Sequence, residues 1–158
     1  MTKANNVEDS GSDPYKLDRF INAQERIYTN VLDELRNGEK RSHWMWFIFP
    51  QIDGLAHSTT SIYYAIRSIE EAQQYLDHPV LGKRLIECAE AVLGVEGRSV
   101  SQIFGYPDDM KLKSSMTLFA HVAASRPDSA FDRILDKYFN GERDHRTLQI
   151  IERLHDNK

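Results

Sequence analysis

The sequence predicts an all-α protein with one domain, residues 14–156, made of six to nine short helices behind a disordered tail, residues 1–13. Apolar residues recur at helical spacing along most of the chain, and capping residues or Gly, Asn and Pro bound each run. No segment combines apolar–polar alternation with the turn residues that join strands. A chain of 158 residues has the ordinary length of one domain and can bury about two-thirds of its unfolded surface.

The first helix has the clearest signals in the sequence. The residues before it are rich in Asn, Ser, Gly and acidic side chains, a composition typical of disorder. Asp13 is placed to cap a helix whose first residue is Pro14, and apolar residues then recur at helical spacing up to Leu35. Asn37 and Gly38 supply the stop. We therefore expect one continuous helix between these signals.

The middle of the chain is divided by proline and glycine. Pro50 interrupts any helix, and residues 54–58 form an expected connecting loop before an apolar pattern resumes over residues 59–66. Residues 68–77 begin with the Ser-x-x-Glu spacing of a capping box and are expected to be helical. A further helix over residues 79–94 starts at a proline and ends at a glycine. We expect these two helices to pack as a hairpin.

The last part of the chain predicts four more helices. A short one over residues 99–104 ends at a Gly-Tyr-Pro stop, after which Asp108 is expected to cap a longer helix. Asp128 or Ser129 opens the next, which Asn140-Gly141 closes. Asp144 caps the final helix.

Composition narrows the function classes. The net charge of -4 and the pI near 5.9 give no overall attraction to phosphate backbones, so nucleic-acid binding is disfavoured, and small-molecule or protein partners are favoured. The polar amino terminus and the lack of any run of about 18 apolar residues predict a cytoplasmic protein that neither spans a membrane nor is exported. The single cysteine, Cys88, falls in an apolar helical pattern and is expected to be a buried, inert thiol.

The most informative segment is residues 41–51, Arg-Ser-His-Trp-Met-Trp-Phe-Ile-Phe-Pro-Gln, called the aromatic run below. It holds both tryptophans, and so many apolar side chains must be buried or line a cavity. One interpretation is that the run is simply core. The other is a site, because Lys40, Arg41, His43 and Gln51 frame the run with groups that suit an anionic or heterocyclic ligand, and an indole offers a stacking face.

A second candidate segment is the turn and helix start over residues 104–117. A helix amino terminus suits anions because its backbone N–H groups are unpaired. Asp109, beside buried aromatics, is the candidate acid or base, whereas Asp108 is expected only to cap. Helical spacing pairs Asp109 with Lys113 and Lys111 with Ser115 on neighbouring faces. The alternative is an exposed ion pair on a capped helix.

Motifs for metal or nucleotide-loop chemistry are absent from the sequence. The six histidines are scattered, with no i, i+4 pair of the kind that binds zinc on a helix. There is no Gly-x-Ser-x-Gly elbow, no phosphate-binding loop and no Gly-x-Gly-x-x-Gly turn. No metal and no cofactor are therefore expected.

The aromatic run, with Gly54-Leu55 and Ser58 behind it, resembles the bacterial and fungal domain-of-unknown-function family eighteen-ten, whose members are often automatically labelled calpastatin. The likeness extends over most of the chain, through residues 64–66, 71–72, 75–76, 78–82, 84–85, 103–105, 109, 111–112, 114–119, 138–139, 141 and 144. It implies a cytoplasmic all-α domain with helices stacked as a superhelix, and it implies no activity. The chain departs from the family pattern at Ala56-His57, where members commonly place Gly after the Leu. So many capped, apolar-faced helices do not fit a disordered calpastatin-like inhibitor.

Two functions are expected from these features. The first is a small-molecule pocket for a nucleotide-like or phosphorylated ligand. If this pocket is catalytic, the expected reaction is hydrolysis of an N-glycosidic bond in a substrate related to NAD or ADP-ribose. This expectation is an analogy: the chain also resembles, in the order and spacing of its motifs, an all-α family associated with NAD and ADP-ribose metabolism. Candidate catalytic residues are Asp109 and His43; candidate ligand-binding residues are Arg41, Trp44, Trp46, Gln51, Lys111, Lys113, Ser114 and Ser115. The alternative is a non-catalytic helical module that binds another protein, in which the aromatic run is core.

Overall fold

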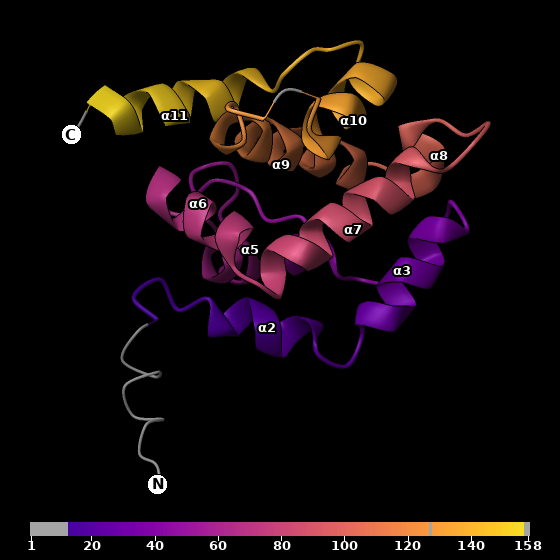
Figure 1. Ribbon diagram of the computed structural model, residues 1–158, viewed down its shortest axis with the longest axis horizontal. Helices are drawn as coiled ribbons and strands as arrows, with labels where there is room; N and C mark the ends of the chain where they lie inside the picture. The colour runs from indigo at the N-terminus through magenta and orange to yellow at the C-terminus, as the bar shows by residue number, and fades with distance from the viewer. Residues whose placement is uncertain (1–12, 127, 157–158) are drawn as a thin grey trace, which may run out of the picture.

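The computed structural model describes residues 13–126 and 128–156, which form ten helices and no β-strand (Figure 1). The predicted all-α fold is confirmed; the predicted tail lies, apart from Asp13, outside the described residues. In chain order the helices are α2 (Asp18–Gln24), α3 (Tyr28–Arg36), α4 (Met45–Ile48), α5 (Thr59–Tyr64), α6 (Ile69–Asp77), α7 (Leu81–Leu93), α8 (Val100–Phe104), α9 (Asp108–Val122), α10 (Ala130–Phe139) and α11 (His145–Asp156). Within the described ranges, no helix is both long and apolar enough to cross a membrane.

The expected single first helix is wrong, because the segment forms two helices, α2 and α3. Asp13 does cap the start, since its carboxylate accepts from the backbone N–H of Leu17 at 2.8 Å, but Lys16 has a φ of 56° and regular helix begins only at Asp18. The chain breaks again between Gln24 and Tyr28. The break lets α2 pack on α4 while α3 packs on α7. Figure 1 shows that α2 and α3 run in different directions. A local pattern carries no information on that change of direction.

Most other helix ends lie where the sequence predicts them. Side-chain caps are present at the predicted Ser68 and at Ser129, one of the two residues expected to open α10, and Asp144 accepts from the N–H of Thr147 at 2.9 Å. The capping serines are Ser58, Ser68, Ser99 and Ser129. Asn140 adopts the left-handed conformation, with a φ of 56°, that closes α10. Caps are local interactions, so sequence spacing alone predicts them.

Asp108 is the exception, because Pro107 occupies the N-cap position of α9. The turn at Gly105, whose φ is 75°, brings its carbonyl oxygen to the N–H of Asp109 at 2.9 Å, so the helix starts without a side-chain cap. The carboxylate of Asp108 is thereby free for partners elsewhere in the fold.

Helices α7 and α9 form the centre of the molecule. α9 packs against α6, α8, α10 and α11, and α7 packs against α3, α6 and α10. A chain of buried rings joins Phe20 to Tyr75 at 5.0 Å between centroids, Tyr75 to Phe119 at 5.5 Å and Phe119 to Phe131 at 5.8 Å. The expected contact of α6 with α7 is present, and it is tight: a Cβ added to Gly82 would lie 1.9 Å from the carbonyl oxygen of Leu76.

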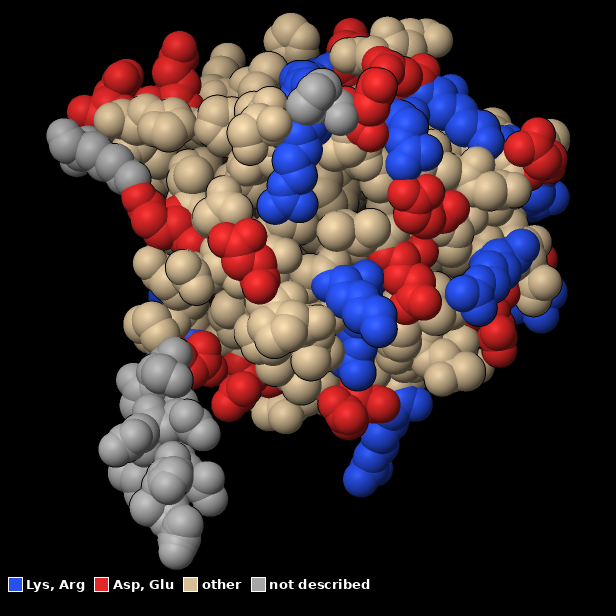
Figure 2. All heavy atoms as spheres, in the orientation of Figure 1, with Lys and Arg blue, Asp and Glu red and all other residues tan. Residues whose placement is uncertain are grey.

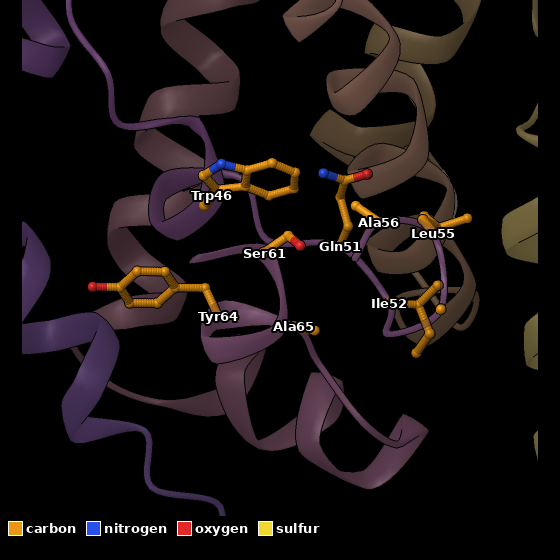
Figure 3. A pocket seen from close by; sticks show the side chains of 9 residues that line it. Trp46, Gln51, Ile52, Leu55, Ala56, Ser61, Tyr64 and Ala65 are labelled. Carbon is orange, nitrogen blue, oxygen red and sulfur yellow. The ribbon is translucent and has the colours of Figure 1, made fainter. Parts of the chain in front are cut away.

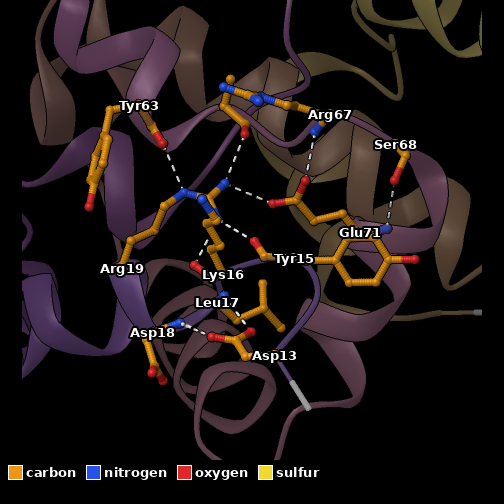
Figure 4. Close-up of polar contacts among 11 residues, drawn as sticks. Asp13, Tyr15, Lys16, Leu17, Asp18, Arg19, Tyr63, Arg67, Ser68 and Glu71 are labelled. Carbon is orange, nitrogen blue, oxygen red and sulfur yellow. Dashed lines mark hydrogen bonds and ion pairs between the residues drawn. The ribbon is translucent and has the colours of Figure 1, made fainter. Parts of the chain in front are cut away.

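The Arg19 side chain fastens α2 to the rest of the domain (Figure 4). Its guanidinium forms an ion pair of 2.7 Å with Glu71 on α6, and the two side chains are only 10% and 4% exposed. It also donates to the carbonyl oxygens of Tyr15, Tyr63 and Ala65. Because the buried charge has a carboxylate and several carbonyls as partners, this contact orients the start of the domain. Elsewhere on the face drawn in Figure 2, basic and acidic side chains are interspersed.

Candidate functional site

The aromatic run is partly core and partly surface. Trp44, Ile48 and Phe49 are buried, and the rings of Trp44 and Phe49 pack against Phe104 at the end of α8. Trp46, on the short helix α4, is only half-buried. The two tryptophans therefore have different environments. The core interpretation describes Trp44, and the site interpretation describes Trp46.

Glu34, at the end of α3, holds the start of the aromatic run in place. Its buried carboxylate accepts hydrogen bonds from the backbone N–H groups of Arg41 and Ser42 and from the indole N–H of Trp44, at 2.8, 3.1 and 2.9 Å. Burial raises the pKa of Glu34, but these hydrogen bonds outweigh it, and the net effect lowers the pKa. Sequence reasoning missed this residue. Its signal was a carboxylate on the apolar face of the first predicted helix, next to Leu35.

A backbone contact brings the two candidate segments together. The N–H of Lys40 donates to the carbonyl oxygen of Ile103 at 2.7 Å, so the chain entering the aromatic run lies beside the end of α8. The next helix, α9, starts there after a three-residue turn. Residues far apart in sequence therefore border one hollow of about 350 Å³, called the groove below. Its lining includes Lys40, His43, Trp46, Thr60, Asp108 and Lys111.

Two lysines share one carboxylate in the groove. Asp108 lies 2.9 Å from the ammonium of Lys40 and 3.1 Å from that of Lys111. Lys111 also lies over the ring of Trp46, 4.1 Å from its centroid, and Lys40 lies over Trp44 at 4.8 Å. Two positive charges against one negative charge leave the groove with an excess of positive charge, and both ammonium groups are held by neighbours rather than free in solvent.

The ionisation of Asp108 decides which proton chemistry is available. Burial raises the pKa of Asp108, but the hydrogen bonds and charges of Lys40 and Lys111 outweigh it and lower the pKa below its ordinary value. Asp108 is therefore ionised at neutral pH and is no proton donor there. His43 also lines the groove and is exposed, and no described residue forms a hydrogen bond with its ring. A neutral imidazole can accept a proton at one ring nitrogen and donate one from the other.

Several predicted site residues do not line the groove. Asp109 is buried and accepts hydrogen bonds of 2.8 Å from the hydroxyl of Ser101 and from the N–H of Met110. The pairing of Asp109 with Lys113 is wrong, because Lys113 forms an ion pair of 2.6 Å with Glu142. The others point elsewhere: Arg41 is exposed and pairs with Glu39, Ser114 donates to the carbonyl of Met110, and Ser115 is fully buried.

Gln51 lies on the other side of Trp46. It lines a small hollow of about 10 Å³, called the slot below, together with Trp46, Ser61 and Tyr64 (Figure 3). The side-chain nitrogen of Gln51 is buried and has no hydrogen-bond partner among the described residues. Trp46 lines both the slot and the groove, so its ring forms part of the wall between them.

Cys88 is not part of either hollow. It is fully buried in α7, and burial raises the pKa of its thiol to about 12. The predicted burial of the thiol is confirmed. Among the described residues, no three His, Cys, Asp or Glu side chains come together in the way that a metal site requires.

Comparisons with known proteins give a family and a relative. The family described as "Protein of unknown function (DUF1810)" matches residues 14–151. The crystal structure of the conserved hypothetical protein Rv1873 from Mycobacterium tuberculosis is 50% identical in sequence, with a TM-score of 0.86, over 89% of this chain and 99% of that chain. No curated protein matches the chain. Neither the family's description nor the relative's name states a ligand or an activity.

Proposed function

Because this chain belongs to the family described as "Protein of unknown function (DUF1810)", whose description supplies no activity, we propose a function from the groove itself. The groove binds a small phosphorylated molecule with a planar ring, such as a nucleotide. The observation that carries the proposal is the pair of lysines, Lys40 and Lys111, that share the single carboxylate of Asp108 beside the ring of Trp46.

The charge balance supports a phosphorylated ligand. Asp108 neutralises one of the two ammonium groups, so an anion that enters the groove meets a net attraction from two ammonium groups that are already in position. The Lys40 side chain is only 6% exposed, so little of its mobility remains to be lost on binding. Phosphate is the common biological anion that accepts several such hydrogen bonds at once.

The aromatic wall supports a planar group on the same ligand. Trp46 is half-buried and its ring lines the groove, and an indole stacks well on flat heterocycles. A hollow of about 350 Å³ has the size of ordinary small-molecule sites. Catalysis is a further part of the proposal: in a hydrolysis reaction His43 would transfer the proton, since Asp108 is held ionised.

Calorimetric titration with ribose 5-phosphate, ribose and inorganic phosphate tests the binding proposal. We expect saturable binding of ribose 5-phosphate that weakens as salt rises, and no measurable binding of ribose. Lys111→Met should weaken binding about tenfold or more, since it removes a charge-assisted hydrogen bond. Lys113→Met is the matched control, because Lys113 lies two residues along the same helix and pairs with Glu142 instead. Equal affinities of the two variants, or no saturable binding to the wild type, would contradict the proposal.

The alternative of a protein-binding module has one observation in its favour. Tyr106 and Met110, one turn apart at the start of α9, are 84% and 43% exposed. They are single apolar side chains on a largely polar surface, which is ordinary for a globular protein. We therefore place the function in the groove, and a protein with no response to any phosphorylated compound would favour the module instead.

A further inference from the structure

Gln51 carries a buried donor that no described residue satisfies. The residue is 8% exposed, and its side-chain nitrogen has no hydrogen-bond partner in the described part of the chain. Buried amides almost always have partners, because the loss of hydration is otherwise uncompensated. The backbone at Gln51 is fixed, because its carbonyl oxygen accepts a hydrogen bond from the N–H of Ile66 at 2.8 Å.

The other buried glutamine shows what a structural amide looks like in this protein. Gln24 is 1% exposed, and its amide nitrogen donates to the carbonyl of Phe47 at 2.8 Å and to the hydroxyl of Tyr75 at 3.1 Å. Its oxygen accepts from Arg84 at 3.2 Å. The side-chain amide of Gln24 is thus fully hydrogen-bonded within the fold, whereas the side-chain nitrogen of Gln51 has no partner among the described residues.

The unpaired donor faces the slot and Trp46. Figure 3 shows the amide nitrogen of Gln51 directed toward the indole of Trp46, with Ser61 and Tyr64 below them in the same hollow. An aromatic ring is only a weak acceptor. The slot holds about 10 Å³, room for one water molecule and no more. A larger group would need a lining side chain to move; Trp46 also lines the groove, so a turn of its ring would join the two hollows.

The same movement would release Lys111. Its ammonium lies 4.1 Å from the centroid of the Trp46 ring, so it loses this contact when the ring turns. It then remains beside Asp108 with donors to spare for a phosphate. Opening of the slot and readiness of the phosphate site are therefore linked through one side chain.

We propose that Gln51 recognises the base of a nucleoside monophosphate, with Trp46 as the movable wall. The base enters between the ring of Trp46 and the amide of Gln51, which donates to a carbonyl oxygen or ring nitrogen, while the phosphate stays at Lys40 and Lys111. The apolar lining of the slot, with Gln51 and Ser61 as its polar side chains beside Trp46 and Tyr64, suits a flat base better than a sugar. This inference rests on the proposed function and adds the ligand class.

The test compares uridine 5′-monophosphate, adenosine 5′-monophosphate and ribose 5-phosphate on three proteins: wild type, Gln51→Met and Gln24→Met. For the wild type we expect at least one nucleotide to bind about tenfold or more tightly than ribose 5-phosphate. Gln51→Met keeps the size of the side chain and removes the donor, so it should weaken that nucleotide about tenfold and leave ribose 5-phosphate unchanged.

Thermal unfolding separates this role from a structural one. Gln51→Met should keep or raise the Tm, because it removes an unpaired buried donor, whereas Gln24→Met should lower the Tm by roughly 5 °C. A fall in the Tm of Gln51→Met that equals that of Gln24→Met would assign Gln51 to the fold and overturn the inference. Tryptophan fluorescence should change with the nucleotide and not with ribose 5-phosphate, and Trp46→Phe should abolish the change.

The outcomes also distinguish a failure of base recognition by Gln51 from a failure of the proposed phosphate binding in the groove. If ribose 5-phosphate binds and the nucleotides bind no tighter, base recognition and the planar-ring part of the proposed function are wrong, and the phosphate site at Lys40 and Lys111 stands. If Gln51→Met binds the nucleotides as the wild type does, Gln51 has no part in recognition. If neither ribose 5-phosphate nor a nucleotide binds the wild type, both proposals fail together.

Discussion

The indole N–H of Trp44 donates a hydrogen bond of 2.9 Å to the buried carboxylate of Glu34. The neighbouring tryptophan, Trp46, has the ammonium of Lys111 over its ring and borders two hollows. One tryptophan therefore belongs to the framework that shapes the groove, and the other belongs to the groove itself. This division gives the two residues opposite mutational signatures.

Trp44→Phe should destabilise the fold far more than Trp46→Phe. The first removes one of three hydrogen bonds to the same buried oxygen of Glu34 and opens a cavity, at a cost of roughly 2–4 kcal/mol in the free energy of unfolding. The second changes a half-buried ring and should cost less than about 1 kcal/mol. Urea unfolding of both variants measures the difference. Similar losses would mean that Trp46 is core after all.

Glu34 should make stability depend on pH in the acid range. Its pKa is lowered in the folded protein, so the stabilisation is fully present above the unfolded value, about 4.3, and is lost as pH falls through the folded value. Glu34→Gln places an NH₂ group among N–H donors and should cost roughly 2–3 kcal/mol at pH 7. Urea unfolding at pH 7 and pH 3.5 should show the gap from wild type narrowing at the lower pH. A constant gap would argue against an ionised Glu34.

The pair of His121 and His155 should weaken the packing of α11 on α9 below neutral pH. Their Nε2 atoms are 3.3 Å apart, an arrangement that requires at least one neutral ring. Burial, then the charges of His155 and Arg143, lower the pKa of His121. Stability is therefore complete above the unfolded value, about 6.5, and is lost as pH falls through the lowered one. His155→Gln should flatten the dependence of unfolding free energy on pH between 7 and 5. His57→Gln, on an exposed loop, should leave that dependence unchanged.

Gly82→Ala should be among the most damaging single substitutions outside the groove. Its Cβ would lie 1.9 Å from the carbonyl oxygen of Leu76, so α6 and α7 must separate, at a cost of roughly 3 kcal/mol or more. Gly94→Ala is the matched control at the other end of α7, since its φ is -77° and the nearest atoms are 3.6 Å away. It should change the free energy of unfolding by less than about 1 kcal/mol. Thermal denaturation of both variants checks the contrast.

Helix ends followed from the sequence because they depend on a few adjacent residues. Ser68 and Ser129 cap helices where the sequence predicts helix starts, and Pro50 falls beyond the end of α4. The break after Gln24 did not follow, because its apolar spacing suits a continuous helix equally well. At the break the amide of Gln24 contacts Phe47 and Tyr75, which are more than twenty positions away and are not visible to a local pattern.

The candidate site was predictable in part. The aromatic run and the start of α9 do border one groove, and His43, Trp46 and Lys111 are among its lining. Asp108 lines it where Asp109 was expected, because the turn at Gly105 starts the helix without a side-chain cap and turns Asp109 toward Ser101. A shift of one residue rotates a side chain by about 100° around a helix, which is enough to exchange the two carboxylates.

By itself the sequence determined the all-α class, most helix ends and the two segments that meet at the groove. These properties depend on apolar spacing, caps and glycine or proline stops, all of which act over a few residues. Only the tertiary structure decided that Trp44 is a buried part of the framework and that Trp46 lines the groove. It alone showed that Lys40 and Lys111 share Asp108, and that the side-chain donor of Gln51 has no partner among the described residues. The physical reason is that helical periodicity assigns a residue to a face of its own helix, whereas its partner depends on how distant helices cross.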